Sequence, residues 1–137
     1  MERNYELINS IDRSGEQFVD PEVAAPDLWA ALAPDFEISG RSDVPDQTTY
    51  RGREESKGFW RMLQEVFAEL RWEPLEFTDL GHAVVVETRL IGRGRGSDVP
   101  IEAEETDVFW FREGQIARVQ GFATKEEALE AARESAG

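Results

Sequence analysis

The sequence predicts an α+β fold, in which helices pack on one face of a curved antiparallel sheet. A long run, residues 53–70, has apolar side chains at helical spacing. Four strand-like runs follow it between residues 71 and 122, and glycine-containing turns join the later ones as hairpins. The 137 residues suit one domain, 1–137, with a core large enough to fold without disulfides.

The part of the chain before the long helix is predicted to hold three short helices and two short strands. Residues 4–13 form the first helix, and Pro21 and Pro26 each start one of the next two. The last of these helices ends before Pro34, because proline disfavours helical backbone in the residue before it. The short strands are expected at 36–40 and 48–52, with a loop at 41–47.

The long helix carries a single apolar stripe, and Trp60 and Met62 widen it. Near the C-terminus, Thr124 and Glu127 have the spacing of a capping box, which predicts a short final helix. The stripe consists of Phe59, Leu63, Val66, Phe67 and Leu70. The four strands are expected at 71–80, 83–92, 101–111 and 115–122.

Composition limits the possible partners and location. With 29 acidic and 15 basic residues, the net charge of −14 repels nucleic acid and anionic membranes. This charge favours solubility, and an acidic recognition surface is the alternative. The absence of cysteine excludes disulfides and thiolate chemistry. Without an apolar run at the start or one of membrane-spanning length, we expect a cytoplasmic protein.

Several motifs, in their order along the chain, resemble the SnoaL-like group of the nuclear-transport-factor-2-like superfamily. The resemblance covers nearly the whole chain from Leu32 onward, whereas the stretch 9–26 is longer than usual. The motifs are "LAPDFEI", "YRGREESKGFWRML", "GRGRGSDVPIEAE", "VFWFREGQIARV" and "KEEALEAA".

The resemblance implies a cone-shaped sheet wrapped around the long helix, with a pocket inside. It also implies a homodimer formed through the outer face of the sheet. Members of the superfamily include ketosteroid isomerase, polyketide cyclases, limonene epoxide hydrolase, scytalone dehydratase and non-catalytic binding domains. The fold therefore does not determine the function, which has to be inferred from the residues of the site.

Strand parity points to two candidate catalytic carboxylates. Side chains alternate between the faces of a strand, and the odd face of 101–111 is predicted to point inward. Glu105 and Asp107 would then face the cavity. The resemblance places Asp107 where ketosteroid isomerase keeps the neutral acid of its oxyanion hole, which is a worked example of pKa tuning. The alternative is a structural ion pair of Asp107 with Arg89 or Arg118.

Tyr5 is the third catalytic candidate, because the resemblance places it where the isomerase has its oxyanion tyrosine. The alternative is a core or dimer-contact tyrosine. The usual positions of the base hold no carboxylate, since the isomerase position reads Gly40 or Ser39 and the last-strand position reads Gly121. Proton shuttling by the known routes therefore lacks its base.

The last strand, 115–122, is expected to divide its side chains by parity. The even-numbered residues, from Ile116 to Phe122, share one face, and Ala117, Val119 and Gly121 share the other. The single histidine, His82, is expected as an exposed turn residue, and no metal or cofactor is predicted. The candidate ligand-binding residues are Arg41, Trp60, Phe67, Arg89, Phe109, Gln120 and Phe122.

Two functional hypotheses follow. The first is a protein that holds a small apolar ligand in the cone, which the missing base favours. The second is an enzyme of the cyclase, isomerase or hydrolase kind on a small hydrophobic substrate. In this case Asp107 acts as acid or base, assisted by Glu105, Arg41 or Tyr5.

Overall fold

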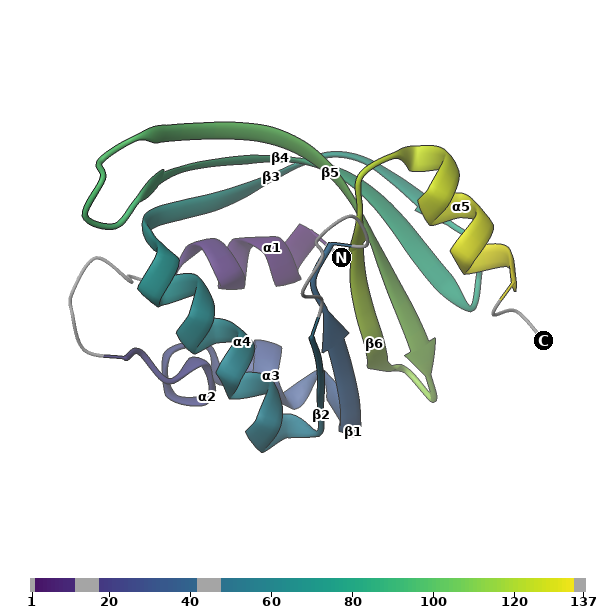
Figure 1. Cartoon of the computed structure of the whole chain (residues 1–137). Coiled ribbons are helices and arrows are strands. Elements are labelled where there is room, and N and C mark those ends of the chain that lie inside the picture. The colour runs from purple at the N-terminus through teal and green to yellow at the C-terminus, as the bar shows by residue number, and fades with distance from the viewer. Residues whose placement is uncertain (1, 12–17, 42–47, 135–137) are drawn as a thin grey trace.

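A computed structural model describes residues 2–11, 18–41 and 48–134 of the chain. Five helices and six strands lie within this part of the chain (Figure 1). The helices are α1 (Glu2–Asn9), α2 (Pro21–Ala24), α3 (Pro26–Ala30), α4 (Arg53–Val66) and α5 (Lys125–Glu134). The strands are β1 (Leu32–Ser39), β2 (Thr49–Arg51), β3 (Phe67–Asp79), β4 (Ala83–Gly94), β5 (Pro100–Arg112) and β6 (Gln115–Phe122).

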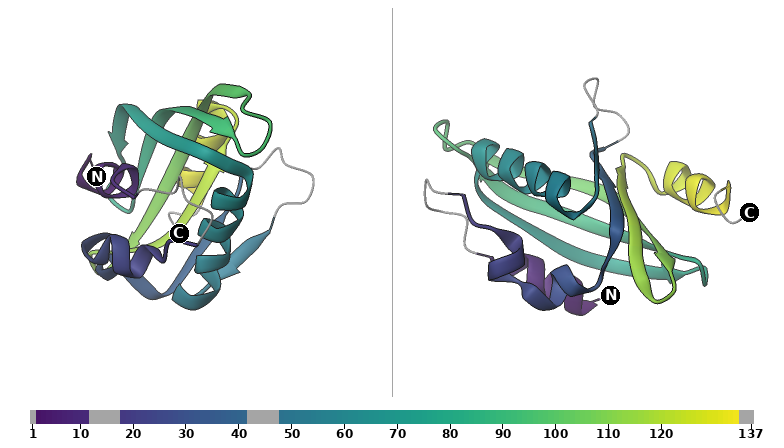
Figure 2. Two further views of the ribbon diagram at one scale, coloured as in Figure 1. Left: turned by 90° about the vertical axis from the view of Figure 1, so that its left-hand side faces the viewer. Right: turned by 90° about the horizontal axis from the view of Figure 1, so that it is seen from below.

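The six strands form one curved sheet in the order β2-β1-β6-β5-β4-β3. Neighbouring strands are antiparallel except for β1 and β6, which pair in parallel. The sheet does not close into a barrel, and β3, β4 and β5 arch over α1 and α4 (Figures 1 and 2). The predicted α+β fold with a curved sheet around the long helix is confirmed.

Two apolar clusters hold the layers together. On the concave side, the main core joins α1, α3 and α4 to the sheet through residues such as Trp29, Trp60 and Phe109. On the opposite face, Trp110 and Phe122 pack with the buried alanines of α5. The sheet is therefore buried on both sides over part of its area, and the inner side holds most of the aromatic residues.

The long helix ends four residues earlier than predicted. α4 ends at Val66, and Phe67 already pairs with Gly94 in the β3–β4 ladder. Arg95, from the β4–β5 hairpin, donates from its backbone N–H to the Val66 carbonyl at 2.8 Å and from Nε to the Gln64 carbonyl at 2.7 Å. Because these carbonyls are satisfied from a distant hairpin, the helical spacing alone could not locate the end of the helix.

The N-terminal elements follow the prediction with two shifts. The proline-started helices are confirmed at Pro21 and Pro26, but the first helix spans Glu2–Asn9 rather than 4–13. The first strand begins at Leu32 and includes Pro34. Its pairing with β6 is irregular there, so no ladder hydrogen bond is required of the proline. Residues 42–47 of the predicted loop lie outside the described residues.

The C-terminal helix begins as the capping box predicts. The Thr124 hydroxyl accepts a hydrogen bond from the Glu127 backbone N–H at 3.2 Å. At the other end of α5, Nε2 of His82 lies 2.7 Å from the Ala132 carbonyl oxygen. His82 was expected to be exposed, but it is half-buried because this contact joins the β3–β4 turn to α5.

Asn9 fixes α1 to the free edge of the sheet. Its side-chain Nδ2 donates to the Trp72 carbonyl at 2.7 Å, and its Oδ1 accepts from the Trp72 backbone N–H at 2.9 Å. The amide thus replaces a neighbouring strand at this point of β3.

Ion pairs join α4 to the start of α2. The ammonium of Lys57 on α4 lies 3.1 Å from Asp20 and 3.0 Å from Glu22.

We predict that Asn9→Ala lowers the free energy of unfolding by about 1–3 kcal/mol, because it removes two hydrogen bonds to the β3 backbone. Urea unfolding followed by tryptophan fluorescence measures the change. The control is Arg3→Ala on the same helix, where the side chain is 69% exposed and a change within about 0.5 kcal/mol is expected. Equal losses in the two variants would contradict the role of Asn9.

Candidate functional site

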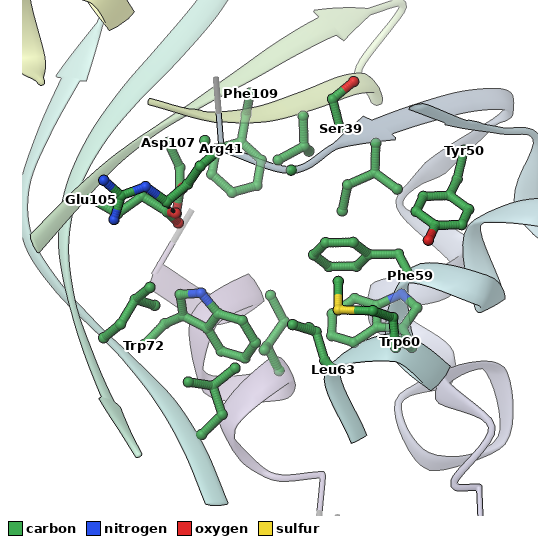
Figure 3. A pocket seen from close by; sticks show the side chains of 18 of the residues that line it. Ser39, Arg41, Tyr50, Phe59, Trp60, Leu63, Trp72, Glu105, Asp107 and Phe109 are labelled. Atoms are coloured by element: carbon green, nitrogen blue, oxygen red, sulfur yellow. Dashed lines mark ion pairs between the residues drawn. The ribbon is translucent and has the colours of Figure 1, made fainter. Parts of the chain in front are cut away.

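A cavity of about 490 Å³ lies between the concave face of the sheet and the helices. Most of its walls are apolar or aromatic (Figure 3). Tyr50, Phe59 and Trp60 lie at one side of the view, and Arg41, Glu105 and Asp107 gather at the other. Such a combination of apolar walls and a few converging polar groups is typical of small-molecule sites.

The polar group of the cavity is assembled from three separate elements. Glu105 and Asp107 are two residues apart on β5 and therefore share its inner face. Tyr5 comes from α1, and its hydroxyl donates a hydrogen bond to Oδ2 of Asp107 at 3.0 Å. Arg41 follows β1, and its Nε lies 4.0 Å from Oε1 of Glu105. We call Tyr5, Arg41, Glu105 and Asp107 the polar cluster.

Aromatic contacts hold the Tyr5 ring in place. Its ring meets Phe77 and Phe109 edge to face, with centroid distances of 6.2 and 5.8 Å. Tyr5 is only 2% exposed, and Asp107 is 6% exposed. The protein therefore shields the Tyr5 hydroxyl and the Asp107 carboxyl from bulk water. Both groups border the cavity.

Burial changes the ionisation of both groups. It raises the pKa of the Asp107 carboxyl above its ordinary value of 3.8, because an apolar surrounding disfavours the charged form. Hydrogen bonds with Glu105 and Tyr5, the charge of Arg41 and a hydrogen bond with Thr88 offset part of this effect. Burial, together with the neighbouring carboxyls, also raises the pKa of the Tyr5 phenol, which therefore keeps its proton and donates a hydrogen bond to Asp107.

Seven of the predicted site residues line the cavity, and three do not. Arg89 lies on the outer face of β4, where its Nε is 3.5 Å from Glu102. Gln120 accepts a hydrogen bond from Arg118 at 3.0 Å, and Phe122 packs under α5. The seven that line it are Tyr5, Arg41, Trp60, Phe67, Glu105, Phe109 and Asp107.

An irregular pairing between β5 and β6 explains why the predicted parity of β6 fails. Trp110 pairs with Arg118, but the next residue of β5 pairs with Ile116, so Ala117 has no partner. This β-bulge changes the parity of the strand. Ile116 faces the cavity together with Val119, not together with the even-numbered residues that follow it. The prediction that these even-numbered side chains share one face is therefore wrong at Ile116.

Asp107 does not form the alternative ion pair with Arg89 or Arg118 that the sequence left open. The Arg118 guanidinium lies over the Trp110 ring, 4.3 Å from its centroid, on the outer face. Arg89 also points to that face, with Glu102. Arg41, which the sequence placed only at a plausible cavity position, is the arginine that approaches the carboxylates.

Several wall residues were not among the predicted ligand-binding residues. The parity of β1 could have indicated Phe36 and Ile38, whereas Trp29 and Tyr50 reach the cavity only through the packing of helices and the short strand β2. Gly40 and Gly121, the two positions without a base, both line the cavity.

No metal or membrane feature accompanies the site within the described parts of the chain. Across residues 2–11, 18–41 and 48–134, no cluster of three or more potential ligand side chains could hold a metal ion. In the same ranges, no helix has both the length and the apolar character needed to cross a membrane.

The comparison with protein families gives one match that covers most of the chain. The model of the SnoaL-like domain matches residues 17–119. The chain belongs to the SnoaL-like family. No curated protein is similar enough to this SnoaL-like chain to count as a match.

Solved structures share the fold of this SnoaL-like protein. One is a SnoaL-like polyketide cyclase from Jannaschia sp., described as putative, with 21% identity and a TM-score of 0.64, covering 99% of this chain and 94% of that one. A protein of ketosteroid isomerase-like fold from Catenulispora acidiphila, in complex with trimethylamine, has 17% identity, a TM-score of 0.65 and coverages of 91% and 90%. TerC, crystallised with polyporic acid, has 20% identity, a TM-score of 0.64 and coverages of 93% and 98%.

We predict that Asp107 makes the stability of this SnoaL-like protein fall as pH rises. A carboxyl whose pKa is higher in the folded state holds its proton more tightly there, so stability declines from about pH 3.8 up to the raised pKa. Asp107→Asn removes this decline, and the variant gains relative to the wild type as pH rises. Urea unfolding from pH 4 to 8 measures the difference. Parallel pH profiles would contradict the assignment, and Glu104→Gln on the outer face is the control.

Proposed function

We propose that the chain binds a small, largely apolar molecule with one polar end in this cavity. The observation that carries the proposal is the position of the polar cluster at one side of an otherwise apolar space. Among the described lining residues, Arg41, Glu105 and Asp107 are the charged ones. A ligand can therefore bury its hydrocarbon part against aromatic rings and place one oxygen at the cluster.

The cluster suits a hydroxyl or carbonyl oxygen. The Tyr5 hydroxyl proton is directed at Asp107, so the Tyr5 oxygen can accept a hydrogen bond from a ligand hydroxyl, and a carbonyl oxygen would receive its hydrogen bond from the protonated form of Asp107. The Glu105 carboxyl and the Arg41 guanidinium lie beside them and provide an acceptor and a further donor. The structures of related fold that were solved with trimethylamine and with polyporic acid support enclosure of small molecules by this fold.

We predict that 2-naphthol binds about tenfold more tightly than naphthalene, because its hydroxyl reaches the polar cluster while the rings fill the apolar part. Ligand fluorescence at constant pH measures both affinities. Tyr5→Phe combined with Asp107→Asn is expected to reduce the preference and leave naphthalene binding unchanged. Glu102→Gln on the outer face is the control. A preference that the double variant does not reduce would place the hydroxyl away from Tyr5 and Asp107.

The second candidate is an enzyme that moves a proton next to a carbonyl group. The observation that favours it is the buried Asp107, whose raised pKa brings a carboxyl closer to the range useful for proton transfer. In such a reaction Asp107 or Glu105 accepts the proton from carbon. Tyr5 then donates a hydrogen bond to the enolate oxygen.

We predict for this candidate that the protein accelerates hydrogen–deuterium exchange at the carbon atoms beside the carbonyl of 2-tetralone, a bicyclic ketone. NMR in deuterium oxide measures the rate. Asp107→Asn is expected to lower the protein-dependent rate about 100-fold. A rate that Asp107→Asn leaves unchanged would remove Asp107 from the mechanism, and absence of any acceleration would favour the binding function alone.

We also propose a homodimer, formed through the outer face of the sheet, and a cytoplasmic location. The sequence resemblance supports the dimer, and the net charge of −14, which favours solubility, supports the location. Light scattering after size-exclusion chromatography tests the dimer directly, since a monomeric mass would contradict it.

A further inference from the structure

The inner face of β6 contains a glycine at the position where the polar cluster touches it. Gly121 pairs with Asp107 of β5 and lines the cavity. A β-carbon at this glycine would lie 2.9 Å from Cδ and 2.9 Å from Oε1 of Glu105. The next nearest atom, Oε2 of the same carboxyl, would be 3.3 Å away. The carboxyl of Glu105 therefore occupies the space that a side chain at position 121 would fill.

Space, rather than backbone conformation, requires glycine here. Four glycines among the described residues have a positive φ, and Gly121 is not one of them. An alanine would fit its extended backbone, and within a strand alanine is ordinarily more stable than glycine. The three nearest atoms to the added β-carbon all belong to Glu105. The cost of a larger residue at 121 should thus depend chiefly on Glu105.

The Glu105 carboxyl is held in place from several sides. Its side chain is 11% exposed, with Oε1 4.0 Å from Nε of Arg41. On the same face of β5, the Asp107 carboxyl lies two residues further along the strand and interacts with it. The strand that passes beneath, β6, contains no carboxylate of its own, as its sequence "QIARVQGF" shows.

We propose that Gly121 is a positioning residue, which lets Glu105 of the neighbouring strand place its carboxyl over β6 at the polar end of the cavity. Glu105 thereby becomes the acceptor that selects ligands with a hydroxyl group. This inference rests on the proposed binding function for its ligand part only. The contact between Gly121 and Glu105 is independent of any ligand.

The test is a double-mutant cycle of the wild type, Gly121→Ala, Glu105→Ala and the combined variant. In the wild-type background, Gly121→Ala is expected to lower the Tm by about 5 °C, because the added carbon displaces the Glu105 carboxyl. In the Glu105→Ala background the same change is expected to leave the Tm unchanged or to raise it. Equal losses of Tm in both backgrounds would overturn the proposal.

A failure to fold is also informative in this cycle. If Gly121→Ala does not fold but the combined variant does, the rescue supports the contact with Glu105. If neither folds, another neighbour excludes the side chain, and the proposal is overturned.

The affinity for 2-naphthol tests the ligand part. Gly121→Ala and Glu105→Ala are each expected to weaken 2-naphthol binding about fivefold and to leave naphthalene binding unchanged. Loss of naphthalene binding as well would overturn the selective role of Glu105. If the wild type binds neither compound, the proposed function fails, whereas the Tm cycle still decides the role of Gly121.

Discussion

The structure depends on one long-range hydrogen bond inside an apolar space, from the Tyr5 hydroxyl to the Asp107 carboxyl. A carboxyl buried this deeply requires a partner or a proton, and the Tyr5 hydroxyl is a partner. The bond joins the first helix to the centre of the sheet. The surroundings of the Asp107 carboxyl on β5 therefore depend on where α1 lies.

Other parts of the fold serve this arrangement. Asn9, one helical turn after Tyr5, fixes α1 to the edge of β3 by pairing with both backbone groups of Trp72. The curvature of the sheet leaves a space of about 490 Å³ below the carboxyls, so that the helices cover the space without filling it. The packing of α1 and the polar cluster are therefore coupled, because a shift of α1 along β3 would withdraw the phenol from Asp107.

Much of this could be predicted from the sequence. The proline helix starts, the capping box at Thr124 and the inward parity of Glu105 and Asp107 are local patterns, and the structure reproduces them. The end of α4 could not be predicted, because Arg95 of a distant hairpin caps it. The face of Ile116 could not be predicted either, because a bulge has no clear signal in one sequence. Arg41 was named, but its approach to Glu105 depends on how β1 and β5 meet across β6.

We propose that the polar end of a bound molecule lies at Tyr5, Glu105 and Asp107. A crystal structure of the protein with 2-naphthol tests this most directly. We expect the naphthol oxygen within hydrogen-bonding distance of at least one of these three side chains, with the rings against the aromatic walls. A naphthol bound outside the cavity, or one whose oxygen points toward Trp60 and Tyr50, would contradict it.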